Sequence, residues 1–356
     1  QTTTTPPQVV NTQQTTAPAV VMERKELPRV AGKFRVAATA KTPLYTHKGK
    51  VFFAGADGKF YIIDMNNEGS VVNTIPINAP IESAPTVFGN IVYFGAMNSR
   101  LYAVNLATGA LLFTVNLDGP LALKNSVAAH GGFIYAGVNG VVYKINRFTG
   151  AVVWKKSTGE NMWCGVAVDG NQIYVPEETG TVKALKDSDG TVVWTKKISE
   201  RISMGKAFVI AGKLVVNTHN GEIKVLNTAT GAPMSSNVTI GKLVDAPYQY
   251  GNLIYYPTSN GITVVNGAAP AIISAINTAG TPYFGIAGQN VYSSFASVKL
   301  KQFNLVGRES WSTTLDGMIV QNPAADELYV YAMTSSGTLY KLNRRDFEMV
   351  RKVVNQ

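Results

Sequence analysis

The chain has 356 residues and a formal net charge of +10, yet only 15% of its residues are charged, while Gly occurs 33 times and Tyr 16 times. Few charges, many glycines and many aromatic β-formers favour sheets and tight turns over helices. The Lys and Arg residues are scattered with no run of five, which argues against nucleic-acid binding. The single Cys164 excludes an internal disulfide, and no apolar run reaches the roughly 18 residues of a membrane-spanning helix.

Residues 1–33 differ in composition from the rest of the chain. They are rich in Thr, Gln, Pro and Val, with no charge before Glu23 and no aromatic residue before Phe34. Such a segment buries too little apolar area to offset the entropy of ordering it, so we expect an extended or disordered tail that a partner protein could order. Because the chain begins with Gln1 rather than Met, the sequence leaves open whether a signal peptide or a lipid anchor precedes it.

After residue 40, a unit of about 40 residues recurs along the chain. Each unit holds a short apolar strand, a Gly-containing turn, a strand with an aromatic residue, a second turn that often reads Asn-Gly, a third strand and a fourth strand. Asn-Gly is a favoured sequence for a two-residue hairpin. The register is given by the polar residue that closes the third strand. It recurs every 38 to 41 residues, at Asp64, Asn105, Asn146, Lys186, Asn227, Asn266, Asn304 and Asn343.

Four antiparallel strands at this period describe one blade of a β-propeller. A single blade leaves both faces exposed, whereas stacked blades cover one another and a closed ring has no exposed end. The sequence therefore predicts an all-β fold, with a closed propeller of about eight four-stranded antiparallel blades over residues 34–356 behind the extended tail. Seven blades remain an alternative, because residues 34–40 can supply a strand to the last blade.

Three copies of the repeat share a distinctive motif. They read LYAVNLATGALLF at residues 101–113, YKINRFTGAVVW at 143–154 and VKALKDSDGTVVW at 182–194. These segments resemble the repeat of pyrroloquinoline-quinone (PQQ) propellers, whose pattern is roughly LYALDxxTGxxxW. The likeness extends over residues 42–356.

Within this family the chain is similar to the non-catalytic, eight-bladed branch that serves outer-membrane barrel assembly. That resemblance implies a protein–protein interaction scaffold of the bacterial cell envelope, periplasmic or associated with the outer membrane, without a cofactor. The implied partners are envelope proteins of a multi-subunit complex, and the basic charge is compatible with peripheral contact to a membrane. The residues given lack a lipid-carrying Cys, so a subunit of another envelope assembly, such as a secretion system, is an alternative.

No catalytic, cofactor-binding or metal-binding residue is predicted. Catalytic members of the family hold PQQ with Ca²⁺, and those that oxidise alcohols use two adjacent cysteines, whereas Cys164 is the single Cys here. The acidic pair Glu177-Glu178 falls in a predicted hairpin turn. The histidines lie near predicted turns of different repeats, where convergence on a metal is unexpected. They are His47, His130 and His219.

The aromatic content leaves two alternative functions open. Many Tyr and Trp residues are compatible with a surface carbohydrate-binding or adhesive propeller. The family resemblance also leaves a PQQ-dependent oxidoreductase as an alternative. Trp154, Trp194 and Trp311 occupy equivalent positions in their repeats, which favours packing between blades over ligand binding.

The loops that join the fourth strand of one repeat to the first strand of the next are predicted to gather on one face. Several carry apolar residues, which either contact a partner or seal neighbouring blades. Two adjacent loops, Arg201–Gly205 and Val244–Pro247, loosely match the pair through which the barrel-assembly branch docks its partner. We predict a partner-binding surface on these and neighbouring loops. Its residues are Arg201, Ile202, Met204, Lys206, Lys242, Leu243, Asp245, Met162 and Trp163.

Overall fold

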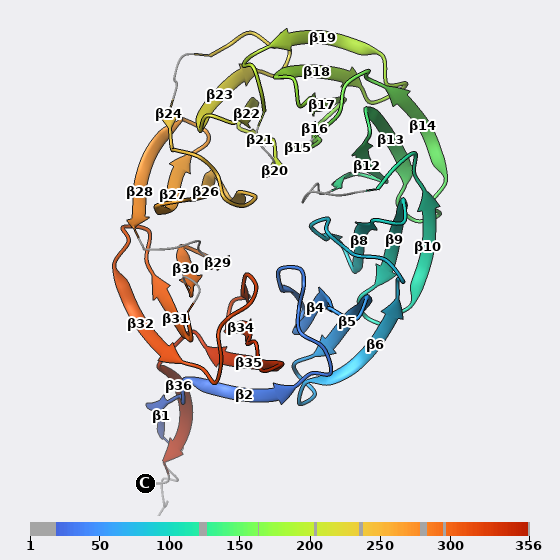
Figure 1. Cartoon of the computed structure of the whole chain (residues 1–356). Helices are drawn as coiled ribbons and strands as arrows, with labels where there is room; N and C mark the ends of the chain where they lie inside the picture. The colour runs from blue at the N-terminus through green and yellow to red at the C-terminus, as the bar shows by residue number, and fades with distance from the viewer. Residues whose placement is uncertain are drawn as a thin grey trace, which may run out of the picture.

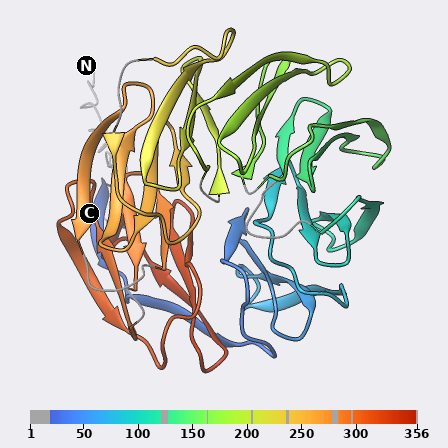
Figure 2. The same ribbon diagram turned by 45° about the horizontal axis from the view of Figure 1, so that its top comes forward.

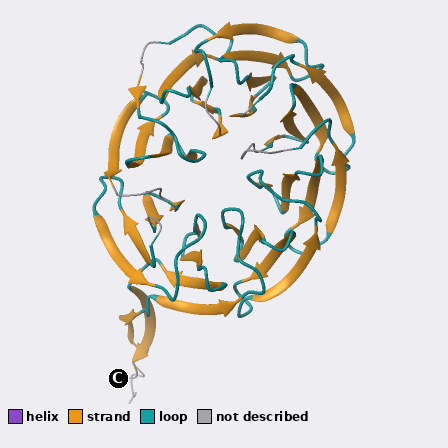
Figure 3. Ribbon diagram, in the orientation of Figure 1, coloured by secondary structure: helices purple, strands orange, loops and turns teal. Residues whose placement is uncertain are grey.

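Short strands and tight turns follow one another along the chain. The structure is a computed structural model that describes residues 19–120, 127–162, 164–202, 205–234, 238–277, 283–294 and 297–354. Within these ranges it contains strands and no helix (Figure 3). Accordingly, no helix long and apolar enough to cross a membrane occurs among the described residues.

The strands form eight four-stranded sheets set radially around a central axis (Figure 1), so the prediction of a closed, eight-bladed β-propeller is confirmed. All strand pairs within the blades are antiparallel, and Figure 2 shows the ring tilted. From the innermost strand outward, blade 1 is β3 (Tyr45–His47), β4 (Lys50–Ala54), β5 (Lys59–Asp64) and β6 (Ser70–Pro76); blade 2 is β7 (Thr86–Phe88), β8 (Ile91–Ala96), β9 (Arg100–Asn105) and β10 (Leu111–Asn116); blade 3 is β11 (Ala128–His130), β12 (Phe133–Val138), β13 (Val141–Asn146) and β14 (Val152–Ser157); blade 4 is β16 (Ala167–Asp169), β17 (Gln172–Pro176), β18 (Thr181–Lys186) and β19 (Val192–Lys197).

The second half of the ring repeats this order. Blade 5 is β21 (Phe208–Ile210), β22 (Lys213–Asn217), β23 (Glu222–Asn227) and β24 (Val238–Thr239); blade 6 is β25 (Tyr248–Tyr250), β26 (Leu253–Thr258), β27 (Gly261–Asn266) and β28 (Ala271–Asn277); blade 7 is β29 (Phe284–Ala287), β30 (Asn290–Ser293), β31 (Lys299–Phe303) and β32 (Glu309–Thr314); blade 8 is β33 (Ala324–Ala325), β34 (Tyr329–Met333), β35 (Thr338–Asn343) and β2 (Val30–Arg35).

The ring is closed by a strand from the opposite end of the chain. Strand β2 pairs with β35 as the outermost strand of blade 8, so both chain ends contribute to one sheet. The closing strand begins at Val30, four residues before the start of the propeller that composition predicted at residue 34. Further out, β1 (Ala19–Glu26) pairs with β36 (Phe347–Val354) in a two-stranded ribbon that projects from the ring (Figure 1).

The polar residue that sets the repeat register caps the turn after the third strand. The Asn105 side-chain oxygen accepts hydrogen bonds from the backbone N–H groups of Ala107 (2.8 Å) and Thr108 (3.2 Å). Such an Asx turn replaces backbone hydrogen bonds at a chain reversal, which explains the preference for Asn. The same bond to the residue two positions on recurs at Asn146, Asn227, Asn266 and Asn304.

Aromatic side chains link each blade to the next. The Tyr135 hydroxyl donates to the Asp187 carboxylate (2.7 Å), and the Tyr93 hydroxyl donates to the carbonyl oxygen of Arg147 (2.9 Å). The fourth-strand Trp154 donates its indole N–H to the Asp187 carbonyl oxygen (3.0 Å). These three side chains thus bury their rings between blades and satisfy their polar atoms on the neighbouring blade.

The glycine of the third turn allows the backbone to lie close to the aromatic ring of the preceding blade. Gly190 has φ +71°, and a Cβ atom there would lie 3.1 Å from the Trp154 ring. Gly231 sits in the same way over Trp194. The Gly and Trp of the repeat motif are therefore partners across a blade junction, and the described core divides into eight apolar clusters that each draw on two adjacent blades.

Candidate partner-binding face and central cavity

Each of four junction loops is fixed to its own blade by an isolated backbone bridge. These bridges join Ala40 to Gly55, Ile202 to Thr218, Leu243 to Thr258 and Ile319 to Thr334. The side chains of Ile202 (1% exposed) and Leu243 (9%) belong to the core clusters of the blades they join. The apolar residue of these loops therefore packs between blades and holds the loop in place.

The structure divides the predicted partner-binding residues into three groups. Ile202, Leu243 and Met162 are buried, and Met162 (5% exposed) packs between blades 3 and 4. Arg201, Lys206, Lys242 and Asp245 retain exposed surface. Trp163 and Met204 lie outside the described residues. Partner binding by all of these residues stays a prediction.

Arg201 and Lys242 lie on neighbouring junction loops, before blade 5 and before blade 6. The Arg201 guanidinium is 3.1 Å from the Glu178 carboxylate, and 41% of its side chain is exposed. Its carbonyl oxygen accepts a hydrogen bond from the backbone N–H of His219 (3.1 Å). Short parallel strands β15 (Cys164–Gly165) and β20 (Gly205–Lys206) join the loops before blades 4 and 5. This part of the face is thus a set of interlinked loops with an exposed basic character.

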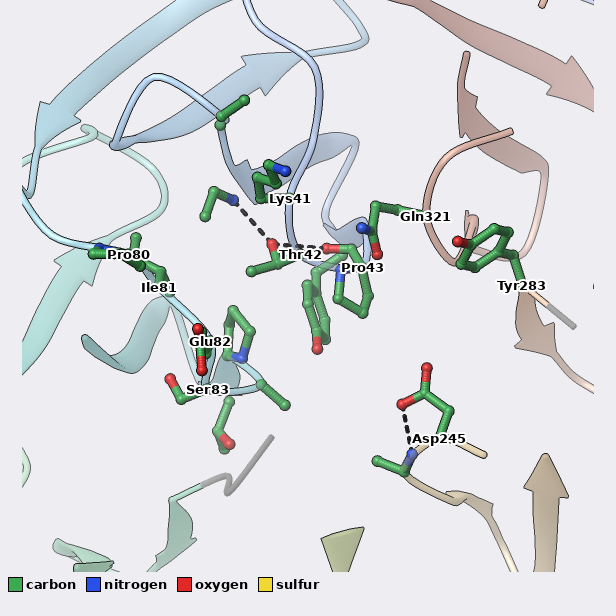
Figure 4. A pocket seen from close by; sticks show the side chains of 18 of the residues that line it. Lys41, Thr42, Pro43, Pro80, Ile81, Glu82, Ser83, Asp245, Tyr283 and Gln321 are labelled. Atoms are coloured by element: carbon green, nitrogen blue, oxygen red, sulfur yellow. Dashed lines mark hydrogen bonds between the residues drawn. The ribbon is translucent and has the colours of Figure 1, made fainter. Parts of the chain in front are cut away.

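A cavity of about 1170 Å³ occupies the centre of the ring. Its wall comes from blades 1 and 2 on one side and from blades 5 to 8 on the other. Figure 4 shows Glu82 and Ser83 across the open space from Asp245 and Tyr283. The polar members of the wall include Lys41, Tyr45, Glu82, Lys206, Asp245, Tyr248, Tyr283 and Gln321. Two predicted partner-binding residues, Lys206 and Asp245, therefore belong to the cavity wall.

Two equivalent hydroxyl residues hold one side of the cavity. Thr42 accepts a hydrogen bond from the backbone N–H of Ala54 (2.9 Å). Ser83 accepts from the N–H of Gly95 (2.7 Å) and donates to its carbonyl oxygen (2.9 Å). In each loop a proline follows within two residues, which limits the backbone further. The wall is therefore preformed, and the sequence signal, Ser or Thr shortly before Pro, was not recognised from the repeat pattern.

Asn322 connects four blades beside the cavity. Its side-chain amide donates to the Tyr248 hydroxyl (3.2 Å) and accepts from the backbone N–H of Phe284 (3.0 Å). Its carbonyl oxygen accepts from the backbone N–H of Leu44 (2.9 Å). Asn322 is 2% exposed, so these bonds are shielded from water and fix the orientation of Tyr248.

The hydroxyls of Tyr45 and Tyr248 remain protonated at neutral pH. Burial raises the pKa of Tyr45 above its usual value of 10, and neighbouring Tyr248 and Asp245 raise it further. Burial and the Asp245 charge likewise raise the pKa of Tyr248. Both side chains therefore act as hydrogen-bond donors over the physiological range.

The cavity wall does not match a PQQ–Ca²⁺ centre. Ca²⁺ requires several carboxylate and amide oxygens at one point. Throughout the described ranges, no three His, Cys, Asp or Glu side chains gather in a way that could hold a metal ion. The acidic pair from the sequence diverges, since Glu177 binds Lys183 (2.9 Å) and Glu178 binds Arg201.

The ring of blades and the Gly–Trp junctions define the class of protein: an eight-bladed β-propeller of PQQ-like repeats. The sequence model of the family described as "Outer membrane protein assembly factor BamB" matches residues 24–161, 138–234 and 178–272. These matches cover more than half of the chain, and the chain belongs to this family.

The relatives are distant in sequence. BamB of Yersinia pestis is 26% identical over 251 residues, which cover 65% of this chain and 60% of that protein. The chain spans 49% and 60% of the length of the first two curated relatives that it matches.

Two solved structures share the fold. The crystal structure of BamB from Moraxella catarrhalis matches with a TM-score of 0.65 at 16% identity, covering 90% of this chain and 100% of that one. The quinohemoprotein alcohol dehydrogenase of Comamonas testosteroni matches with a TM-score of 0.67 at 14% identity, covering 88% and 76%. At these identities the likeness establishes the fold alone.

Proposed function

We propose that this protein is a non-catalytic scaffold of outer-membrane protein assembly, located in the periplasm or on the outer membrane of a bacterium. The observation that carries the proposal is membership of the BamB family, whose relatives are named as assembly factors. The proposed partners are proteins of an envelope assembly complex.

The proposed docking surface is centred on the junction loops before blades 5 and 6. Partly exposed Arg201 and exposed Lys242 lie on adjacent loops, and Lys206 and Asp245 lie further toward the cavity. The buried side chains of Ile202 and Leu243 hold these loops in position, so a partner meets a preorganised surface. Arginine is enriched at interfaces, where its planar guanidinium can donate two parallel hydrogen bonds to one carboxylate.

The test compares two variants that change charge equally. Arg201→Gln with Lys242→Glu alters the loop face, whereas Lys156→Gln with Lys196→Glu alters exposed residues of the outer strands β14 and β19. Tagged proteins are isolated from solubilised envelopes, and outer-membrane assembly components are quantified by mass spectrometry. We expect the amount of co-isolated assembly components to fall about tenfold with the loop variant and to stay unchanged with the control. Equal recovery with both variants would exclude this surface, and absence of assembly components from the unaltered protein would exclude the function.

A further inference from the structure

The central cavity presents polar groups that the propeller does not use for its own stability. Across the described part of the chain, the side-chain polar groups of Tyr45, Tyr283 and Gln321 make no hydrogen bond. Tyr248 accepts from Asn322, so its own proton is available to a further acceptor. These four side chains are therefore donors, and Gln321 is also an acceptor, on the wall of a cavity of about 1170 Å³.

Carboxylates supply acceptors from opposite sides of the same space. Glu82 comes from the loop before blade 2 and Asp245 from the loop before blade 6, and Figure 4 shows them on different sides of the opening. Lys41 and Lys206 also line the wall, so positive and negative groups are both present. A wall with both signs favours a neutral ligand over an anion or a cation.

The apolar part of the wall disfavours an extended peptide as the ligand. Four lining residues are prolines, at Pro43, Pro80, Pro85 and Pro247. Proline lacks a backbone N–H, so each of these positions interrupts the ladder of main-chain hydrogen bonds that strand addition requires. Proline and tyrosine rings do, however, offer flat apolar surfaces between the polar groups.

We propose that the cavity binds a short, neutral oligosaccharide. Each sugar hydroxyl both donates and accepts, which matches a wall that carries Tyr and Gln donors together with Asp and Glu acceptors. The C–H faces of sugar rings match the proline and tyrosine surfaces. The volume of about 1170 Å³ exceeds that of a typical drug-sized pocket, which gives room for more than one ring. The Trp residues considered from the sequence pack between blades, so this site uses tyrosines instead.

The proposal is tested by isothermal titration calorimetry with chitotriose, maltotriose and cellotriose. The full chain is compared with Tyr45→Phe/Tyr248→Phe, which removes two hydroxyls from the cavity and keeps the rings. The matched control is Tyr250→Phe, since Tyr250 lies on the same strand β25, is 49% exposed and does not line the cavity. We expect saturable binding of at least one trisaccharide, a loss of about tenfold or more in affinity in the double variant, and no change in the control.

Three results would overturn the proposal: no saturable binding of any of the three sugars, equal affinity of the double variant and the full chain, or an equal loss in the control. Thermal unfolding of each variant separates a lost site from a lost fold. A proline-rich peptide that binds in place of the sugars would assign the cavity to a protein partner. Sugar binding does not rest on the docking function. The variant Arg201→Gln with Lys242→Glu leaves the four donors unchanged, so it should still bind the sugar.

Discussion

A buried ion pair between blades 3 and 4 gives the sharpest test of how the blades are held together. The Lys144 ammonium is 2.8 Å from an Asp187 carboxylate oxygen and 3.0 Å from the Asp187 carbonyl oxygen. It also lies 4.0 Å from the centroid of the Phe133 ring. The second carboxylate oxygen accepts from Tyr135. Only 6% of the Lys144 side chain is exposed, so its charge depends on Asp187 for compensation.

We expect Asp187→Ala to lower the free energy of unfolding by about 3 kcal/mol, at the low end of the range for breaking a buried pair, because 23% of the Asp187 side chain is exposed. Adding Lys144→Met removes the uncompensated ammonium and should recover about half of that loss, with the unpaired Tyr135 hydroxyl accounting for the rest.

Urea unfolding at neutral pH, followed by tryptophan fluorescence, measures both variants. The exposed pair Lys155–Asp118 serves as the control, because surface ion pairs contribute little. If Asp187→Ala and the double variant are equally destabilised, the uncompensated charge is not the cause. A single-variant loss no larger than that of the surface control would refute the reasoning.

Three other perturbations address closure, the cavity and the repeat. Burial alone would raise the pKa of Asp316, but hydrogen bonds from Lys33 of the closing strand and from three hydroxyls outweigh it and lower that pKa. The contribution of Asp316 to stability is therefore fully present above its unfolded pKa of about 3.9 and is lost as the pH falls. In the unaltered protein the melting temperature should therefore drop between roughly pH 4 and pH 2, and Asp316→Asn should make this drop smaller. An unchanged drop would contradict this. Asn322→Leu should cost about 2 to 4 kcal/mol in urea unfolding, because it leaves a buried N–H without an acceptor, and a cost below about 1 kcal/mol would show that the bond is dispensable. Gly190→Ala should cost about 1 to 3 kcal/mol in the same assay, because its φ of +71° and the Trp154 ring disfavour a Cβ atom, and a neutral result would mean that the junction relaxes.

Much of the fold could be predicted because a propeller blade is a local structure. The Asn-Gly hairpins, the Asn that caps the third turn and the Tyr of the second strand each occupy fixed positions within one repeat. Their chemistry depends on neighbours a few residues away, so the spacing was enough to predict about eight blades, with seven left as an alternative. The resemblance of the Gly–Trp motif to PQQ propellers likewise came from single repeats, and membership of the BamB family bears it out.

The partner-binding surface could be predicted only in part, because its members alternate between core and solvent. Ile202 and Leu243 are apolar in polar loops, which fits either docking or packing. Their burial depends on the bridges to Thr218 and Thr258, and these follow from how each loop folds onto its blade. Arg201 is partly exposed and pairs with Glu178 from another loop, and its contact with a partner stays a prediction.

The cavity and the exact closing strand, Val30–Arg35 with its partner β35, were decided by the tertiary structure. Tyr45, Tyr248 and Asn322 are far apart in the chain and meet only because the ring brings blades 1, 6 and 8 around one axis. Strand β2 pairs with β35 across almost the whole length of the chain, and no local pattern near Val30 specifies that partner. Contacts within a repeat are encoded by residues that are close in sequence, whereas the cavity and the closing strand depend on the curvature accumulated over eight blades, which no single repeat contains.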